Sequence, residues 1–252
     1  SMFRAAAYGA LRLGDIENGD VLYLWEPLFH IGGSEVIVLA VFLDITIALT
    51  ERFSASRFWA EVREAEATHI HHLGGILAIL MKQPPSPADT EYSVRVAWGA
   101  GAPAAIRRQF AERFGVKVTE SYGMTECSSV TTVNAGGDPD AGVGVPLPHF
   151  EVRIADDEGQ PLGPGAMGEV LVREKEPGFV MAGYFRNREA TELALRDGWM
   201  HTGDLGSFDE QGNYHYLGRK KDSLRRRGEN VSAWEVERVL LTHPRVEECA
   251  VV

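Results

Sequence analysis

Short apolar runs and helix-forming stretches alternate through the first half of the chain, and this alternation restricts the possible folds most. Strands are predicted at residues 21–25, 45–49, 69–71, 94–98 and 114–118. Helices are predicted at residues 2–13, from a turn at 27–33 to about 43, from a cap at Ser54 or Ser56 to 66, at 73–82 and from Pro103 to 114. Because strands that alternate with helices form right-handed βαβ units, we expect a parallel sheet.

The pattern changes after Asn134, where a turn-rich connection begins. Residues 151–154 and 169–172 alternate as half-buried strands around an acidic turn, and 205–208 with 214–217 predict a hairpin. A helix is predicted at 187–196. The strongly charged residues 219–228 indicate a linker, after which a helix at 233–241 and a strand from 246 begin a further unit.

The expected fold class is α/β. A parallel βαβ subdomain is predicted at 1–134, and a small antiparallel, β-rich subdomain at 135–218. Residues 219–252 are predicted to hold the linker and the start of a C-terminal α+β domain.

Composition excludes several classes of function. The chain has 252 residues and a net charge of −11, so nonspecific binding to nucleic acid is not indicated. The two cysteines, Cys127 and Cys249, have no metal-ligand or redox spacing, and a reduced, cytoplasmic protein is expected. No apolar run reaches the length of a membrane span, and no signal peptide is evident.

Residues 121–126 read Ser-Tyr-Gly-Met-Thr-Glu and follow the strand predicted at 114–118. The carboxyl ends of parallel strands form the edge at which open α/β sheets bind ligands. Tyr122 offers an aromatic face, Thr125 a hydroxyl and Glu126 a carboxylate, while Gly123 allows close approach of the backbone. An ordinary strand-to-helix turn with Thr125 as the helix N-cap is the alternative interpretation.

Further motifs follow in a fixed order. They are PLFH at 27–30, GEVLVR at 168–173, WMHTGD at 199–204, GRKKD at 218–222 and RGENVSAWEVE at 227–237. Together with residues 121–126, this series resembles the adenylate-forming, AMP-binding superfamily. Within it the chain is most similar to the acyl-CoA ligase branch, near the crotonobetaine/carnitine-CoA ligases. Several separated motifs in one order are more specific than any single one.

The resemblance implies a nucleotide site, and the residues that match the family's cofactor-binding positions are Gly99, Ala100, Gly101, Ala102, Pro103, Glu120, Ser121, Tyr122, Gly123, Met124, Thr125, Asp204 and Arg219. By this resemblance Tyr122 stacks on adenine, and Asp204 and Arg219 hold the ribose. Lys221 matches the hinge about which the C-terminal domain rotates between the two half-reactions. Thr125, at the α-phosphate, and Glu126, the Mg²⁺ ligand, are the catalytic residues. Without the resemblance, residues 99–103 indicate tight strand–helix packing, and Asp204 a turn residue that bonds its own backbone.

The same resemblance implies that His30, His72, Trp98 and Gly123 line the acyl and CoA side of the site. Glu120 is either a neighbour of the nucleotide or only a charge at a strand end. His69 and His71 lie close to His72 in sequence, but alternate residues of a strand face opposite sides, so a metal site formed by all three is not expected.

The implied reaction joins a small carboxylic acid to CoA through an acyl-adenylate, with ATP and Mg²⁺. The family's phosphate loop and catalytic lysine have no match in these residues, so we expect an internal piece of a longer enzyme that is inactive alone. A peptide-synthetase or luciferase-like adenylating domain, or a non-catalytic nucleotide-binding remnant, remain alternatives. The sequence predicts neither the acyl group nor the oligomeric state.

Overall fold

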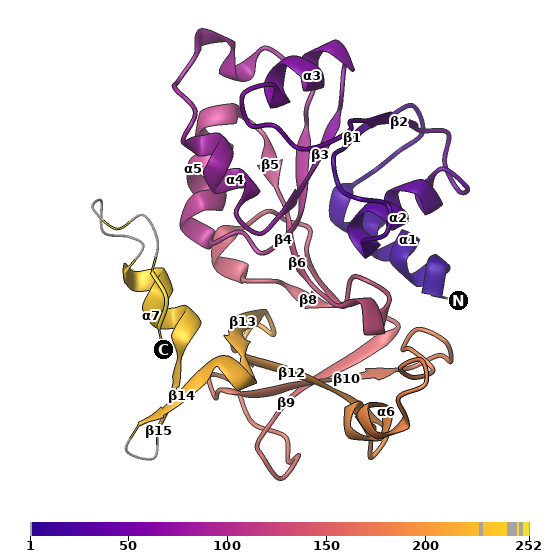
Figure 1. Cartoon of the computed structure of the whole chain (residues 1–252), viewed down its shortest axis with the longest axis vertical. Coiled ribbons are helices and arrows are strands. Elements are labelled where there is room, and N and C mark those ends of the chain that lie inside the picture. The colour runs from indigo at the N-terminus through magenta and orange to yellow at the C-terminus, as the bar shows by residue number, and fades with distance from the viewer. Residues whose placement is uncertain (1, 227–228, 241–245, 247–248, 252) are drawn as a thin grey trace. The chain divides into compact units, whose positions relative to one another are not determined.

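The computed structural model describes residues 2–226, 229–240, 246 and 249–251 (Figure 1). The chain forms two compact units, and each is described by itself. One comprises Ser1–His149 with Glu176–Met181, and the other comprises Phe150–Lys175 with Ala182–Val252.

The first unit is a largely parallel sheet with helices on both faces. Its strands are β1 (Val21–Leu24), β2 (Thr46–Leu49), β3 (His69–Leu73), β4 (Val96–Ala100), β5 (Lys117–Val118), β6 (Glu120–Tyr122), β7 (Thr132–Asn134) and β8 (Val145–Pro146). In the described residues the order is β2-β1-β3-β4-β6-β7-β8, with β5 paired to β4. Pairs among β1 to β6 are parallel, and β7 and β8 add antiparallel pairs. The parallel sheet predicted from the alternation is therefore confirmed.

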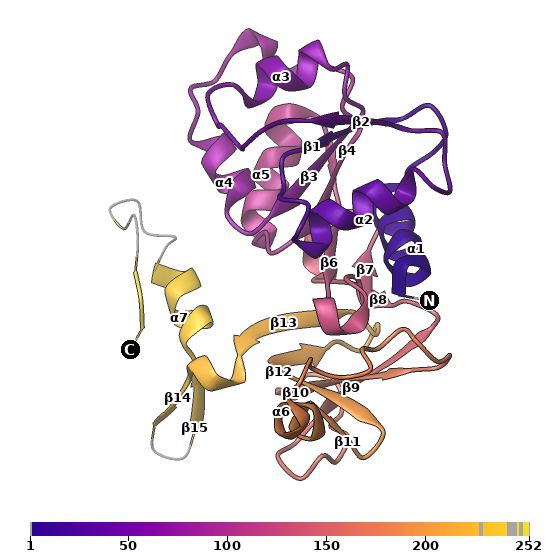
Figure 2. The same ribbon diagram turned by 45° about the vertical axis from the view of Figure 1, so that its right-hand side comes forward.

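The helices of this unit are α1 (Met2–Gly14), α2 (Ile31–Leu39), α3 (Phe58–Glu64), α4 (Ile76–Met81) and α5 (Ala104–Phe114). Single 3₁₀ turns, η1 (Pro87–Thr90), η2 (Thr125–Cys127) and η3 (Pro139–Ala141), lie in the connections. Figures 1 and 2 show α4 and α5 along one face of the sheet and α1 and α2 along the other. One apolar core of this unit contains the fully buried side chains of Phe58, Leu77 and Phe110. Burial of each contributes about 2–3 kcal/mol to the free energy of folding.

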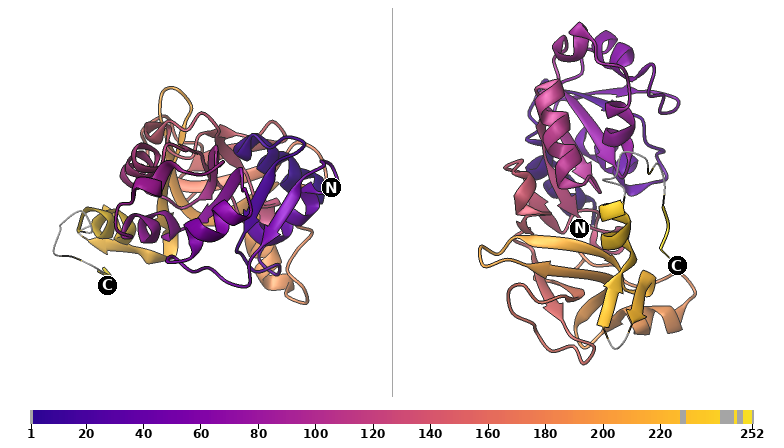
Figure 3. Two further views of the ribbon diagram at one scale, coloured as in Figure 1. Left: turned by 90° about the horizontal axis from the view of Figure 1, so that it is seen from above. Right: turned by 90° about the vertical axis from the view of Figure 1, so that its left-hand side faces the viewer.

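The second unit is an antiparallel sheet (Figure 3). Its elements are β9 (Phe150–Ala155), β10 (Gly168–Glu174), α6 (Arg188–Ala194), β11 (Leu195–Arg196), β12 (Trp199–Phe208), β13 (Tyr214–Arg219), η4 (Lys220–Asp222), β14 (Ser223–Arg226), β15 (Glu229–Ser232) and α7 (Ala233–Leu240). The strand order is β11-β12-β10-β9, and β13 pairs with β12. The antiparallel β-rich part predicted after Asn134 is confirmed in β9, β10, β12 and β13.

Several local predictions are wrong. Phe114 ends α5 rather than beginning a strand, because Gly115 caps the helix with φ +67° and Phe110 and Phe114 are both buried on its core face. Neither Ser54 nor Ser56 caps α3, which has Arg57 at the N-cap position without a side-chain hydrogen bond. Helix α2 ends at Leu39, four residues before the predicted end near residue 43.

The segment predicted as a charged linker also has regular structure. Arg219 is the last residue of β13, and a 3₁₀ turn and the hairpin β14–β15 follow. The predicted end of the next helix at residue 241 lies outside the described residues. Of the strand predicted from residue 246, residues 247–248 and 252 also lie outside them, and 246 and 249–251 form no strand.

Candidate nucleotide-binding site

The carboxyl ends of three parallel strands meet at one edge of the first unit. The pairing register sets Leu73 of β3 beside Ala100 of β4, and Ala100 beside Ser121 of β6. The turns that begin after these residues therefore leave the sheet side by side. This arrangement brings the segment 99–103 next to the segment 121–126, as the sequence predicts for a ligand edge.

Gly99 is required by packing within the sheet. Its φ is +156°, and a Cβ there would lie 1.8 Å from the carbonyl oxygen of His72. Ser121 Oγ donates to the Gly99 carbonyl at 2.9 Å. Tight packing, one of the two interpretations of this turn, thus explains Gly99, and the same packing fixes the backbone beside Ser121.

Glu120 braces the same turn. Its side chain is buried, and its carboxylate accepts hydrogen bonds from the amides of Gly101 and Ala102. Arg107 of α5 lies with Nε 3.7 Å from Glu120 Oε2 and donates from Nη2 to the Pro139 carbonyl at 2.9 Å. Burial raises the pKa of Glu120 to about 8, against the opposing effect of Arg107 and the two amides. Glu120 is thus more than a charge at a strand end.

The turn that follows β6 carries the two predicted catalytic residues. Thr125 is exposed and opens η2, for which Met124 is the N-cap and makes no side-chain cap bond, so Thr125 is not a helix cap. Glu126 is partly exposed, and its carbonyl accepts from the Met181 amide at 2.7 Å. A Cβ on Gly123 would lie 1.6 Å from a carbonyl oxygen of this loop, so that glycine serves the loop's own fold.

The residues predicted for the acyl side are not equally accessible. His30 is the N-cap of α2, accepts from the Gly32 amide at Nδ1, and has a side chain that is 43% exposed. His72 and Trp98 are buried. His72 Nε2 lies 2.9 Å from the Thr119 carbonyl oxygen, and burial lowers the pKa of His72 to about 3, which keeps the ring neutral. Roles for His72 and Trp98 in substrate binding stay predictions.

The neighbouring histidines turn to different partners. His69 Nε2 lies 3.0 Å from the Gly14 carbonyl oxygen, and His71 Nδ1 lies 2.8 Å from Glu26 Oε1. In the described part of the chain, no three or more His, Cys, Asp and Glu side chains are arranged to hold a metal ion.

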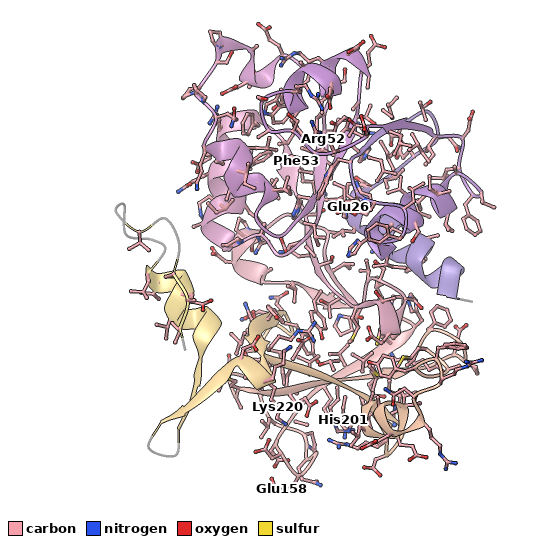
Figure 4. The ribbon with its side chains drawn as sticks, viewed as in Figure 1. Glu26, Arg52, Phe53, Glu158, His201 and Lys220 are labelled. Carbon is pink, nitrogen blue, oxygen red and sulfur yellow. The ribbon has the colours of Figure 1, made fainter. Side chains whose placement is uncertain are left out.

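Two buried acids, Glu26 and the α2 residue Glu35, have no counterpart in the sequence prediction. Both are close enough to His71 to interact with it, and Glu26 is labelled in Figure 4. Burial raises the pKa of Glu35 to about 7, helped by Glu26 and opposed by His71 and a hydrogen bond with Ser129. The apolar stretch around Glu35 could have signalled a buried acid, but its partners are distant in sequence.

The raised pKa of Glu35 predicts a pH dependence of stability. The folded state holds the Glu35 proton more tightly than the unfolded chain, whose pKa is 4.5, so this contribution is full below pH 4.5 and is lost as the pH rises to about 7. Going from pH 6 to pH 8, we expect a loss of about 1 kcal/mol in the free energy of unfolding. Glu35→Gln should flatten the profile by that amount in urea titrations; an unchanged profile would contradict it.

Asp204 and Arg219 face each other in the second unit. They are register partners on β12 and β13, with Arg219 Nε 3.0 Å from Asp204 Oδ1. The Asp204 side chain is 3% exposed, and that of Arg219 is 47% exposed. A shallow open hollow of about 470 Å³ is lined by Gly203, Arg219, Lys220 and Lys221, and its cations suit an anionic ligand.

Asp204 does not lie in a turn between two strands, contrary to the sequence prediction. It belongs to the continuous strand β12, in which Gly203 has φ +69° and the register with β13 shifts between Leu205 and Gly206. Such a shift marks a bulge, which bends a strand and redirects its side chains without reversing the chain.

Comparison with known proteins identifies the family of this chain. The profile of the AMP-binding enzyme family matches residues 2–185. A crotonobetaine/carnitine–CoA ligase from Shigella sonnei is 34% identical over 99% of this chain and 49% of its own length. The chain thus spans about half the length of the curated relatives it matches.

Solved structures of related enzymes also resemble this chain in sequence and in fold. The o-succinylbenzoate CoA synthetase from Bacillus subtilis, in complex with its acyl-adenylate intermediate, superposes with a TM-score of 0.86 at 34% identity, covering 99% of this chain and 51% of that one. An amide bond synthetase from Marinactinospora thermotolerans superposes with a TM-score of 0.87 at 31% identity, covering 100% and 52%.

Across the described residues, no helix is both long and apolar enough to cross a membrane.

The family profile covers most of the chain, and the relatives and solved structures agree with it in both sequence and fold. The chain therefore belongs to the AMP-binding enzyme family, whose members matched here include CoA ligases.

Proposed function

We propose that this chain is the nucleotide- and acyl-binding part of an ATP-dependent acid–CoA ligase. The observation that carries the proposal is the register that sets Ala100 beside Ser121, because it joins the 99–103 turn to the 121–126 turn at one sheet edge. Relatives solved with ATP and magnesium, and with an acyl-adenylate, support a nucleotide at the corresponding site.

The roles follow from the chemistry of the side chains. Tyr122 is 8% exposed, and we assign its aromatic ring to stacking on adenine. The brace from Glu120 holds the adjoining turn in a fixed conformation. The exposed Thr125 hydroxyl is free to donate to an α-phosphate oxygen. Asp204 accepts hydrogen bonds from ribose hydroxyls, and Arg219 holds its carboxylate in place.

The residues fit a magnesium ion held mainly by the nucleotide. Mg²⁺ prefers hard oxygen ligands and commonly uses one or two carboxylates together with substrate phosphates. The partly exposed Glu126 supplies one such carboxylate, and the described residues offer no cage of three. The ion, when bound, would neutralise charge on the phosphates; Glu126 would orient it.

The reaction proceeds in two steps. A substrate carboxylate oxygen attacks the α-phosphorus of ATP, and pyrophosphate leaves with the electron pair of the broken P–O bond. The CoA thiolate then attacks the acyl carbonyl carbon, and AMP leaves. Positioning and neutralisation of charge, rather than covalent help from the protein, supply most of the acceleration.

A second acceptor is worth testing because one matched structure is an amide bond synthetase. In that case the acyl-adenylate would pass to an amine instead of to CoA. The adenylating half of the site would be unchanged.

The experiment uses the full-length polypeptide and a panel of small carboxylic acids. We expect acid-dependent release of pyrophosphate, followed by release of AMP that depends on CoA. Release that depends on an amine but not on CoA would favour the second acceptor. Absence of acid-dependent pyrophosphate release across the panel, when the protein is folded and binds ATP, would leave only a nucleotide-binding remnant.

A further inference from the structure

One buried carboxylate of the second unit connects the strand that carries Asp204 to the segment that carries Lys221. Glu169 lies on β10 with its side chain 8% exposed. Its Oε1 accepts from the Gly203 amide at 3.2 Å, and its Oε2 accepts from Lys220 Nζ at 3.1 Å. The two contacts tie the residue before Asp204 and the residue after Arg219 to the same side chain.

The charges around Glu169 favour its ionised form. Burial would raise the pKa of Glu169, but Lys220, the Gly203 amide and His201, whose Nδ1 lies 3.6 Å from Oε2, lower it below its ordinary value. The pKa of Lys220 is raised in turn: burial lowers it, but Asp157 and Glu169 outweigh burial. Figure 4 labels His201, on β12, and Lys220, the first residue of η4.

Lys220 has a second, weaker partner. Its Nζ lies 3.1 Å from Asp157 Oδ1, in the connection between β9 and β10. The Asp157 side chain is 72% exposed, so water competes for this contact far more than for the buried Glu169. The Glu169–Lys220 pair is therefore the stronger of the two attachments.

The next residue differs from Lys220. Lys221 is exposed and lines the hollow, and among the residues whose side chains are described it has no carboxylate within ion-pair distance. Among the residues whose side chains are described, Lys220 is therefore ion-paired to the sheet and its connections, whereas Lys221, the position that the family resemblance makes the hinge, is not.

We propose that Glu169 and Lys220 form a clamp that fixes the near end of the hinge, so that backbone rotation begins at Lys221 and leaves Asp204 and Arg219 undisturbed. Glu169 and Lys220 are then positioning residues. The proposal rests on the proposed two-step function for its purpose, but the clamp itself can be tested without any catalysis.

The test is limited digestion with an endoproteinase that cleaves before aspartate, which attacks the Lys221–Asp222 bond whatever residue stands at 220. With Lys220→Met, we expect cleavage at this bond to be about fivefold faster, because a charged hydrogen bond to a buried carboxylate is lost. Glu169→Gln should act alike, since its amide oxygen still accepts from Gly203 while its charge is gone. Mass spectrometry identifies the product.

Two controls separate the clamp from general loosening. Lys220→Arg should restore slow cleavage, and Asp157→Asn, which removes only the exposed partner, should change it little. The thermal midpoint of every variant should lie well above the digestion temperature, so that cleavage reports local opening at this bond and not global unfolding. Unchanged cleavage in folded Lys220→Met and Glu169→Gln proteins overturns the clamp, and so does an equal acceleration in Asp157→Asn.

A second readout uses the full-length polypeptide. Lys220→Met should change the ratio of the adenylation and thioester-forming rates about threefold or more, as expected of a hinge effect. A merely structural role would lower both rates together. If no adenylation occurs in the parent protein, the proposed function fails, yet the proteolysis still decides on the clamp.

Discussion

Replacing Asp204 by Ala is expected to weaken ATP and acyl-adenylate binding together by roughly 10- to 100-fold, because a charged acceptor for hydroxyl groups contributes about 1.5–3 kcal/mol. The structure adds a second reason, which is that the Asp204 carboxylate is already fixed in position. Asp204 is held by Arg219 at 3.0 Å and its side chain is 3% exposed, so little reorganisation is needed when a ribose binds. Calorimetric titration of the full-length polypeptide with a nonhydrolysable acyl-adenylate analogue measures the effect.

The matched control is Asp204→Asn, which preserves the size of the side chain and one acceptor oxygen. It should lose less affinity than Asp204→Ala. Because Asp204 is buried beside Arg219, both variants need a measured unfolding midpoint to show that they are folded at the titration temperature. Unchanged affinity in a folded Ala variant refutes the ribose role.

The fold was predictable where local patterns carry the information. Apolar runs correctly predicted β1 and β4, because buried parallel strands are continuous apolar segments. The strand β3 was also predicted, although three of its five residues are histidines. Alternation likewise predicted β9 and β10, although only the first part of β9 alternates in burial, and β10 has four consecutive buried residues. Errors of a few residues at the element ends reflect local capping, as at Gly115.

The error at Asp204 has a physical cause. A Thr-Gly-Asp sequence is typical of a turn, and Gly203 does adopt positive φ. However, β12 pairs with β10 on one side and β13 on the other, and these contacts keep the strand continuous through a bulge. Pairing with partners that are distant in sequence outweighs the local turn preference, which no local pattern reveals.

Buried charges were the other feature that the sequence did not show. Glu120 was predicted as a candidate, but its partner Arg107 lies thirteen positions earlier, on α5. Glu35 and Glu26 have buried side chains near a histidine of β3. Whether an acid is solvated or buried depends on which elements pack around it, so its pKa and role follow from the fold and not from the residue type.

The second large effect concerns the hinge. Replacing Lys221 by Pro should leave adenylation within about threefold and slow thioester formation by roughly 100-fold, because proline fixes φ near −65° and removes an N–H. The structure places Lys221 in the 3₁₀ turn η4, and 3₁₀ turns in general have φ close to the value that proline imposes. Proline at residue 221 therefore favours this value of φ and opposes a rotation that would change it.

Pyrophosphate exchange and CoA-dependent AMP release measure the two steps separately in the full-length polypeptide. Lys221→Ala is the control, since it removes the exposed side chain but leaves φ and ψ free, and it should change neither step by much. Proline also restricts the backbone conformation of the preceding residue, Lys220. The contact of Lys220 with Glu169 must therefore be checked in the proline variant, by the rate of limited proteolysis at a bond near residue 221. If that contact persists and both steps still fall equally, residue 221 is part of a structural connection, and rotation at this position is not what separates the two half-reactions.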